Sequence, residues 1–148
     1  MLCEIRPMRL EDLPGVMNIE RQVFSLPWPP EAFNASILKD SWVICQGEEL
    51  LGYIMYHNVL DESMIINFAI APDHQRRGHG KHLLERTLDI MQQQDLKTFY
   101  LDVRVSNVTA QRLYRLHGFE VLGRRKNYYS QPEEDAIVMV RHAKPVTP

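Results

Sequence analysis

Residues 70–81 read Ile70-Ala71-Pro72-Asp73-His74-Gln75-Arg76-Arg77-Gly78-His79-Gly80-Lys81, and they are the most informative part of the chain. The apolar, β-prone residues 64–70 end at Pro72, and beyond the two alternate glycines the leucines recur at helical spacing. Glycine lets a ligand approach the main chain, and the first N–H groups of a helix have no partners inside it and attract anions. The stretch therefore predicts a strand, a loop and a helix, with a loop suited to a phosphate group.

Two further observations narrow the range of ligands that this loop could bind. A glycine in a helix is unfavourable by up to about 1 kcal/mol relative to alanine, so two of them in a first turn call for a reason. The loop also lacks the Lys-Ser/Thr pair of a nucleotide P-loop and the third glycine of a dinucleotide-binding fold. A phosphate-bearing ligand of another kind remains, beside the plainer alternative of a solvated basic turn whose glycines merely start a helix.

The rest of the chain predicts further strands and helices around this unit. Expected strands cover residues 4–9, 42–45, 50–58, 64–70, 98–105, 119–125 and 136–141. Expected helices cover residues 13–24 after an Asp12 cap, 31–38, 78–94, and 107–117, which a left-handed Gly118 closes. This order predicts an α/β (α+β) fold with a mixed, mostly antiparallel sheet that contains one parallel strand pair.

Composition limits the class of protein. The 148 residues have room for one domain, residues 1–148, and 45% apolar with 24% charged residues is typical of a soluble globular chain. Seventeen basic against nineteen acidic residues give a net charge of −2, which argues against direct binding of nucleic acid. No apolar run approaches the roughly 20 residues of a membrane span, and the first residues do not resemble a secretory signal. Cys3 and Cys45 form no CxxC pair, so a cytoplasmic protein with reduced thiols is expected.

The loop sequence Gln75-x-x-Gly78-x-Gly80, between a strand and an amphipathic helix, resembles the acetyl-CoA pyrophosphate loop of the GNAT acetyltransferases. The likeness extends along nearly the whole chain, through Asp12-Leu13, Ile19-Glu20, Phe24, Pro27-Trp28, residues 101–107, Leu113-Tyr114, Gly118-Phe119, residues 127–129 and residues 134–139. It implies a GNAT-type fold of about seven strands and about four helices, with acetyl-CoA as co-substrate and no metal. The cofactor contacts that it implies are Phe68, Ala69, Ile70, Gln75, Arg76, Arg77, Gly78, His79, Gly80, Lys81 and Asn107.

Within that superfamily the chain resembles the RimI-type ribosomal protein alanine N-acetyltransferases. The resemblance implies transfer of acetyl to a protein N-terminal α-amine, with the N-terminal alanine of small-subunit ribosomal protein number eighteen as the expected acceptor. It implies Asp102 as the base and Tyr114 as the acid. The usual base in these enzymes is glutamate, so the shorter Asp102 favours proton removal through a bridging water. The alternative for Asp102 is a strand-end carboxylate paired with an arginine such as Arg104.

The predicted helix 107–117 places Asn107 and Tyr114 on one face, because seven residues make two turns. Alternatives are a helix cap for Asn107 and a half-buried core side chain for Tyr114. The resemblance makes Trp28, Tyr128 and Tyr129 candidates for contact with the acceptor, although a tryptophan between prolines is also a common packing residue. The acidic run 133–135 would suit a basic peptide or would simply be a solvated loop.

Other assignments stay open at this level. His74, His79 and His82 show no recognised metal-ligand arrangement, so no metal is expected. The acceptor of a GNAT enzyme could instead be lysine, a polyamine or a small metabolite. A catalytically weak acyl-CoA-binding sensor would carry the same phosphate loop.

Overall fold

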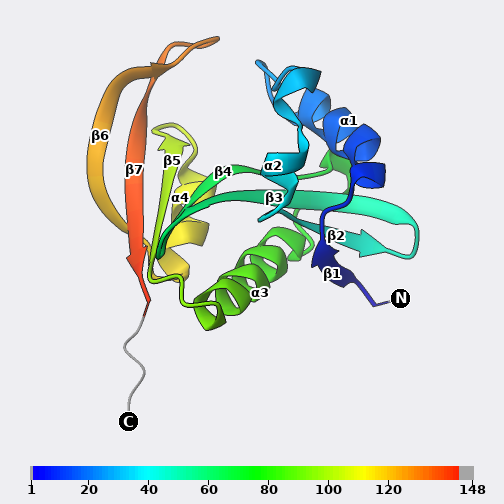
Figure 1. The fold of residues 1–148 in the computed structure, drawn as a ribbon. Helices are drawn as coiled ribbons and strands as arrows, with labels where there is room; N and C mark the ends of the chain where they lie inside the picture. The colour runs from blue at the N-terminus through cyan, green and yellow to red at the C-terminus, as the bar shows by residue number, and fades with distance from the viewer. Residues whose placement is uncertain (1, 144–148) are drawn as a thin grey trace. The chain divides into compact units, whose positions relative to one another are not determined.

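The computed structural model describes residues 2–143 and contains, within that range, seven β-strands and four α-helices (Figure 1). The strands are β1 (Glu4–Pro7), β2 (Trp42–Gln46), β3 (Glu49–Val59), β4 (Glu62–Ile70), β5 (Thr98–Arg104), β6 (Glu120–Tyr129) and β7 (Glu134–His142). The α-helices are α1 (Leu13–Val23), α2 (Ala35–Leu38), α3 (His79–Gln93) and α4 (Val108–Leu116). The strands form one sheet in the order β1-β2-β3-β4-β5-β7-β6. β4 pairs with β5 in parallel and the other described ladders are antiparallel, which confirms the expected fold class.

The chain packs as two compact units. The first contains the described residues up to His57 together with Ile66–Leu88, and the second contains Asn58–Ile65 and the described residues from Asp89 onward. The single domain expected over residues 1–148 stays a prediction. No helix within residues 2–143 is both long and apolar enough to cross a membrane.

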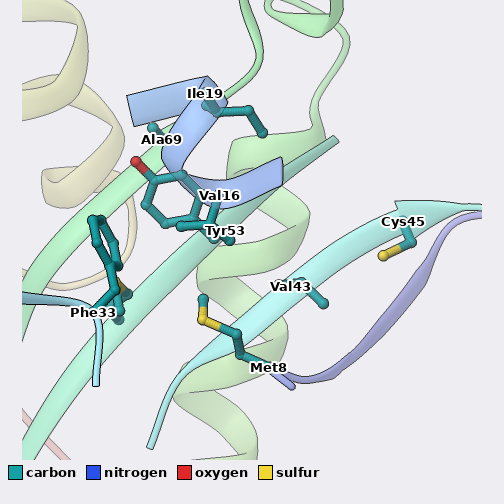
Figure 2. Close-up of a cluster of buried hydrophobic side chains, with 9 residues drawn as sticks. Met8, Val16, Ile19, Phe33, Val43, Cys45, Tyr53 and Ala69 are labelled. Atoms are coloured by element: carbon teal, nitrogen blue, oxygen red, sulfur yellow. The ribbon is translucent and has the colours of Figure 1, made fainter. Parts of the chain in front are cut away.

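A cluster of buried side chains forms the core of the first unit (Figure 2). Its members are Met8, Val16, Ile19, Phe33, Val43, Cys45, Tyr53, Met55 and Ala69. The helical spacing of Val16 and Ile19 turns both side chains of α1 toward this cluster, where they are 0% and 4% exposed. Full burial of one such aliphatic side chain stabilises the fold by about 1.5–3 kcal/mol.

Two details at the start of the first unit differ from the sequence-based expectation. Asp12 precedes α1 but makes no side-chain cap, because its carboxylate accepts bonds from Arg6 at 2.7 and 2.8 Å and from the N–H of Arg9. The helix expected over residues 31–38 is interrupted. Asn34 has an extended backbone and its side chain accepts the N–H groups of Ser36 and Ile37, so α2 begins only at Ala35.

The second unit contains the ladder β5-β7-β6, whose last two strands form the long hairpin visible in Figure 1. β5 alternates in burial, with Phe99, Leu101 and Val103 buried and the residues between them partly exposed. Both hairpin strands are longer than expected, because pairing continues to Tyr129 opposite Glu134. Gly118 adopts the expected left-handed conformation, with a φ of 85°, after α4.

Candidate active site

The loop between β4 and α3 carries two residues with left-handed backbone. A 3₁₀ turn over Pro72–His74 leads into it, Arg76 has a φ of 65° and Gly78 a φ of 84°. The left-handed Gly78 is why α3 begins at His79 and not at residue 78 as expected. Left-handed residues alternating with right-handed ones turn successive main-chain N–H groups to one side, which is a known way to bind an anion. A side chain at position 78 would meet no neighbouring atom, but any residue other than glycine would be strained by the left-handed backbone there.

The main-chain N–H groups of residues 76–81 have no hydrogen-bond partner within residues 2–143. The first bond of α3 runs from the N–H of His82 to the carbonyl oxygen of Gly78, so the preceding amides are left over. The side chains of Arg76, Arg77 and Lys81 are exposed. This combination of open amides and positive charge suits a phosphate or diphosphate.

The structure brings the loop together with the expected cofactor strand. A Cβ atom on Gly80 would lie 3.6 Å from both Phe68 Cζ and Ile70 Cγ1. Phe68 and Ile70 lie on the partly exposed face of β4, whereas Ala69 is 6% exposed and belongs to the core cluster. Only the main chain of Ala69 is therefore available to a ligand.

Other polar groups brace this loop. Gln75 Nε2 donates to the carbonyl oxygen of Ile70 at 3.0 Å, so this predicted cofactor contact closes the turn with its own side chain. His74 Nε2 lies 2.7 Å from Glu49 Oε1, and Cys3 Sγ lies 3.8 Å from His79 Nδ1. Burial, then the neighbouring His74, lowers the pKa of His79. The part of the chain that the structure describes contains no group of three metal-ligating side chains.

Gly52 in β3 is required by packing and was not predicted. A Cβ atom at this position would lie 2.6 Å from the carbonyl oxygen of Ala69 and 2.5 Å from the Ile70 side chain. Such a contact is too short, so only glycine lets β3 approach the end of β4 so closely.

Trp28, a predicted acceptor contact, is held by both its ring and its main chain. The indole packs on Phe33 with 5.5 Å between ring centroids and lies against the core cluster. The N–H of Trp28 donates to Glu20 Oε2 at 2.8 Å. The structure therefore shows Trp28 as a packing residue, as the alternative supposed. Its contact with an acceptor stays a prediction.

Glu20 was not predicted as a functional residue. Its carboxylate is buried in the first unit at 1% exposure and also accepts bonds from Tyr53 Oη and Asn67 Nδ2. Burial, and then the bond to Glu20, raises the pKa of Tyr53. The signal was present in the sequence, because Glu20 is an acid at a position whose helical spacing places it on the apolar face of α1.

Asp102 in the second unit pairs with an arginine, but not with the one expected. Arg125 Nε lies 3.4 Å from Asp102 Oδ1, and the Asp102 side chain is 8% exposed. Arg125 belongs to β6, and it reaches Asp102 of β5 past the intervening strand β7. Arg104 instead donates to Glu134 and to the carbonyl oxygens of Ser130 and Pro132.

Tyr114 and Asn107 occupy the two ends of α4. Asn107 caps the helix by accepting the N–H of Ala110 at 3.1 Å, as the alternative for this residue supposed. Tyr114 is 8% exposed and its ring packs edge-on against Phe119 at 5.7 Å. Burial, and then the neighbouring Tyr129, raises the pKa of Tyr114, so the phenol keeps its proton at neutral pH. These contacts leave the acid role of Tyr114 and the cofactor role of Asn107 as predictions.

The hairpin holds Tyr128 and Tyr129 beside this carboxylate and phenol. Their ring centroids are 5.0 Å apart, and the Arg104 guanidinium lies over the Tyr129 ring at 4.5 Å. Burial, and then the charge of Asp102, raises the pKa of Tyr129 to about 12. The second unit therefore collects two protonated phenols and a carboxylate that lie close enough to influence one another.

Two acids of the run 133–135 are used inside the protein. Glu134 accepts the N–H of Ser106 and bonds from Arg104, and Asp135 accepts bonds from Arg124 and from the N–H of Asn127. Asn127 has a φ of 53° and lies where the register between Arg125 and Tyr129 shifts. Glu134 and Asp135 therefore shape the hairpin, which neither interpretation of the run anticipated.

Comparisons of this sequence with known proteins find acetyltransferases. The family model described as "Acetyltransferase (GNAT) family" matches residues 13–119. A putative ribosomal protein bS18-alanine N-acetyltransferase of Bacillus subtilis (strain 168) is 36% identical over 139 residues, which are 91% of this chain and 92% of that protein.

Two solved structures extend the comparison to the fold. The crystal structure of the ribosomal-protein-S18-alanine N-acetyltransferase from Escherichia coli has a TM-score of 0.90 and 30% identity, covering 99% of this chain and 97% of that one. Arabidopsis thaliana NAA60 in complex with acetyl-CoA has a TM-score of 0.86 at 21% identity, covering 96% of this chain and 100% of that one, and this supports the fold alone.

Proposed function

The chain belongs to the acetyltransferase (GNAT) family, and on that basis we propose that it transfers the acetyl group of acetyl-CoA to the N-terminal α-amine of a protein. The acceptor that we propose is the N-terminal alanine of ribosomal protein bS18. The observation that carries this proposal is the similarity to relatives that bear this activity in their names, over more than nine-tenths of both chains.

The first unit supplies the proposed binding site for the diphosphate of acetyl-CoA. The open amides of residues 76–81 would bind its oxygens, and Arg76, Arg77 and Lys81 would balance its charge. Phe68 and Ile70, on the partly exposed face of β4, would contact the acetyl end together with the main chain of Ala69. Gly80 leaves room for that contact, because a side chain there would point toward Phe68 and Ile70.

The second unit supplies the proposed acid and base. The amine nitrogen attacks the thioester carbonyl carbon, the C–S bond breaks, and the departing thiolate takes the proton of Tyr114. The amine loses its proton through a water molecule to Asp102, whose carboxylate is one methylene short for direct contact. A peptide α-amine has a pKa of about 7.7–8.0, so a weak base is sufficient. The phenol of Tyr114 carries its proton at neutral pH, as a proton donor must, although the raised pKa makes it a weaker acid than a free tyrosine.

Trp28, Tyr128 and Tyr129 are the proposed contacts of the acceptor peptide, and Asn107 is a proposed contact of the pantetheine arm. We also propose that the protein acts in the cytoplasm. Cys3 and Cys45 are free thiols, which is usual in a reducing compartment.

A panel of acceptors tests the proposal. The purified protein and acetyl-CoA are incubated with peptides that carry the bS18 N-terminus, with peptides that begin with other residues, and with free lysine and spermidine, and products are identified by mass spectrometry. Acetylation of the free alanine amine is expected, and a peptide already blocked at its N-terminus is the control. Acetylation of lysine or spermidine instead would indicate another amine acceptor, and coenzyme A binding without any acetylation would indicate a sensor.

A further inference from the structure

One buried carboxylate joins three separate segments of the first unit. Glu20 of α1 accepts the N–H of Trp28 with one oxygen, and the hydroxyl of Tyr53 and the side-chain amide of Asn67 with the other. At 1% exposure this side chain has lost its water, so the three donors replace its hydration. Figure 2 shows Tyr53 in the same buried cluster as Val16 and Ile19 of α1.

The bond to Trp28 fixes a segment that has few main-chain hydrogen-bond donors. Residues 27–30 read Pro-Trp-Pro-Pro, and proline has no N–H group. The N–H of Trp28 is therefore the only main-chain donor that these four residues possess. Because the prolines also restrict the backbone, fixing this single N–H fixes the direction in which the Trp28 ring leaves the chain.

The bond to Asn67 controls the cofactor strand. With its Nδ2 held by Glu20 Oε1 at 2.8 Å, the side chain of Asn67 turns its Oδ1 toward the main chain. There it accepts the N–H of Phe68 at 3.0 Å. Glu20 thus acts through Asn67 on the first residue of the Phe68–Ile70 segment.

We propose that Glu20 is a positioning residue for acetyl transfer, holding the acceptor segment at Trp28 and the acetyl-contacting segment at Phe68 in one fixed arrangement. This inference rests on the proposed function, which assigns those two segments to the acceptor and to the acetyl group. Glu20 contacts neither reactant in the reaction scheme and acts through its three donors.

With asparagine at position 67, the chemistry of the site requires an acid at position 20. A carboxylate accepts on both oxygens and offers no hydrogen, which matches three donors. In a Glu20→Gln variant one oxygen becomes an NH₂ group. Whichever way the amide turns, this NH₂ faces either the N–H of Trp28 or the donors of Tyr53 and Asn67. One of the two segments must therefore move.

Steady-state kinetics with the peptide acceptor separate positioning from folding. Rates are expressed per coenzyme A-binding site, counted by calorimetry, so that misfolded protein does not lower the measured kcat. Glu20→Gln is expected to raise the peptide KM and lower kcat, each by about fivefold or more. Asn67→Ala keeps the bond to Trp28 and is expected to lower kcat by a similar factor with KM within about twofold. Unchanged kcat and KM per binding site in Glu20→Gln, or a loss of binding sites alone, would overturn the proposal.

A matched control removes a buried polar contact elsewhere in the same unit. Tyr56 Oη lies 2.8 Å from Thr87 Oγ1, a contact that does not involve Glu20 or its three donors, and Tyr56→Phe removes that bond. Its kcat and KM are expected to stay within about twofold of the parent values. Changes equal to those of Glu20→Gln would mean that any lost buried bond has this effect, and would overturn the positioning role.

An exchange of the two groups provides a rescue. In the double variant Glu20→Gln, Asn67→Asp the new NH₂ donates to the new carboxylate, whose other oxygen still accepts the N–H of Phe68. The amide oxygen that remains at position 20 is then free to accept the N–H of Trp28. Recovery of the peptide KM to within about threefold of the parent value supports the proposal, and absence of recovery overturns it.

Fluorescence tests the same inference without turnover. In a Trp42→Phe background Trp28 is the only tryptophan, and Trp42 Nε1 has no hydrogen-bond partner among the described residues, so its loss breaks no bond. Glu20→Gln is expected to increase iodide quenching of Trp28, and Tyr56→Phe is not. Equal quenching in all three proteins would overturn the proposal even if acetylation is observed. Increased quenching would support it even if the acceptor panel finds no product.

Discussion

The guanidinium of Arg104 lies over the ring of Tyr129, 4.5 Å from its centroid, and also donates to Glu134. Glu134 in turn accepts the N–H of Ser106, just before α4. These contacts tie the hairpin that carries Tyr129 to the connection between β5 and α4. Hydrogen bonds from the side chain and then the main-chain N–H of Ser106, followed by Arg104, hold the pKa of Glu134 below its usual range, so the carboxylate is ionised at neutral pH.

Replacing Glu134 by glutamine is expected to raise the peptide KM severalfold with little change in coenzyme A affinity, because Arg104 loses its charged partner and Tyr129 its support. Glu133→Gln is the matched control, since Glu133 is the exposed neighbour and has no recorded contact within residues 2–143. Kinetics with the acceptor peptide and calorimetry with coenzyme A check both. Equal KM values in the two variants would show that the contact has no role in acceptor binding.

Tyr114→Phe removes the proposed proton donor and leaves the ring packed on Phe119. Turnover is expected to fall by about 100-fold or more, while coenzyme A affinity stays within about threefold. Tyr56→Phe serves as the control for loss of a buried hydroxyl. Turnover within about fivefold of the parent value would exclude Tyr114 as the acid.

Gly80→Ala is expected to stabilise the protein and weaken it as an enzyme. The new methyl group meets only ordinary contacts at 3.6 Å, and alanine is favoured over glycine in a helix by about 0.8–1 kcal/mol. The same methyl group points toward Phe68 and Ile70, where the acetyl end is proposed to bind. Thermal unfolding should therefore show a higher Tm and calorimetry a weaker affinity for acetyl-CoA.

Gly123→Ala in β6 is the control for that experiment, because a methyl group there meets nothing within 4 Å. Acetyl-CoA affinity is expected to be unchanged in this variant. A Gly80→Ala protein with undiminished affinity would argue against the placement of the acetyl group.

Asp12→Asn tests the brace at the start of the first unit. Hydrogen bonds from Arg6 hold the pKa of Asp12 below its ordinary value of 3.8. The unfolded chain therefore binds more protons in the acid range, so the stabilisation is complete above that value and is lost as the pH falls below it. Urea unfolding at pH 7 should show the variant less stable by about 1–3 kcal/mol, and the difference should shrink at pH 3.

Asp89→Asn is the control for this pH dependence, since Asp89 lies exposed on α3 with no recorded contact in the described part of the chain. The free energy of unfolding of this control should differ little from that of the parent protein at both pH values. A difference for Asp12→Asn that is equally large at pH 3 and pH 7 would contradict the assigned cause.

Much of the fold was predictable because it rests on local patterns. The strongly apolar character of residues 98–105 predicted β5, and the glycines identified the loop before α3. The last residues of β6 were not predicted, because residues 126–129 are polar and aromatic and do not alternate. Their place in the strand depends on pairing with β7 and on the hydrogen bond from the N–H of Asn127 to Asp135, which is distant in sequence. The second helix was overestimated because the cap at Asn34 competes with helix continuation.

The candidate site divides in the same way. Residues that a motif specifies, such as Gly78, could be selected from the sequence, because their conformation depends on their neighbours. The pairing of Asp102 with Arg125 could not, because it depends on β7 lying between their strands. Glu20 is an intermediate case. An acid on the apolar face of a helix signals a buried polar contact, but its partners come from β3, β4 and the segment at Trp28.

The unused main-chain amides after Arg76 have a consequence for the life of the protein in the cell. Binding that supplies partners to these groups favours the native state over the unfolded one, by about 2.7 kcal/mol when the ligand is present at 100 times its Kd. Under the proposed function that ligand is the thioester itself. Heat tolerance and resistance to proteases should then rise and fall with the concentration of acetyl-CoA.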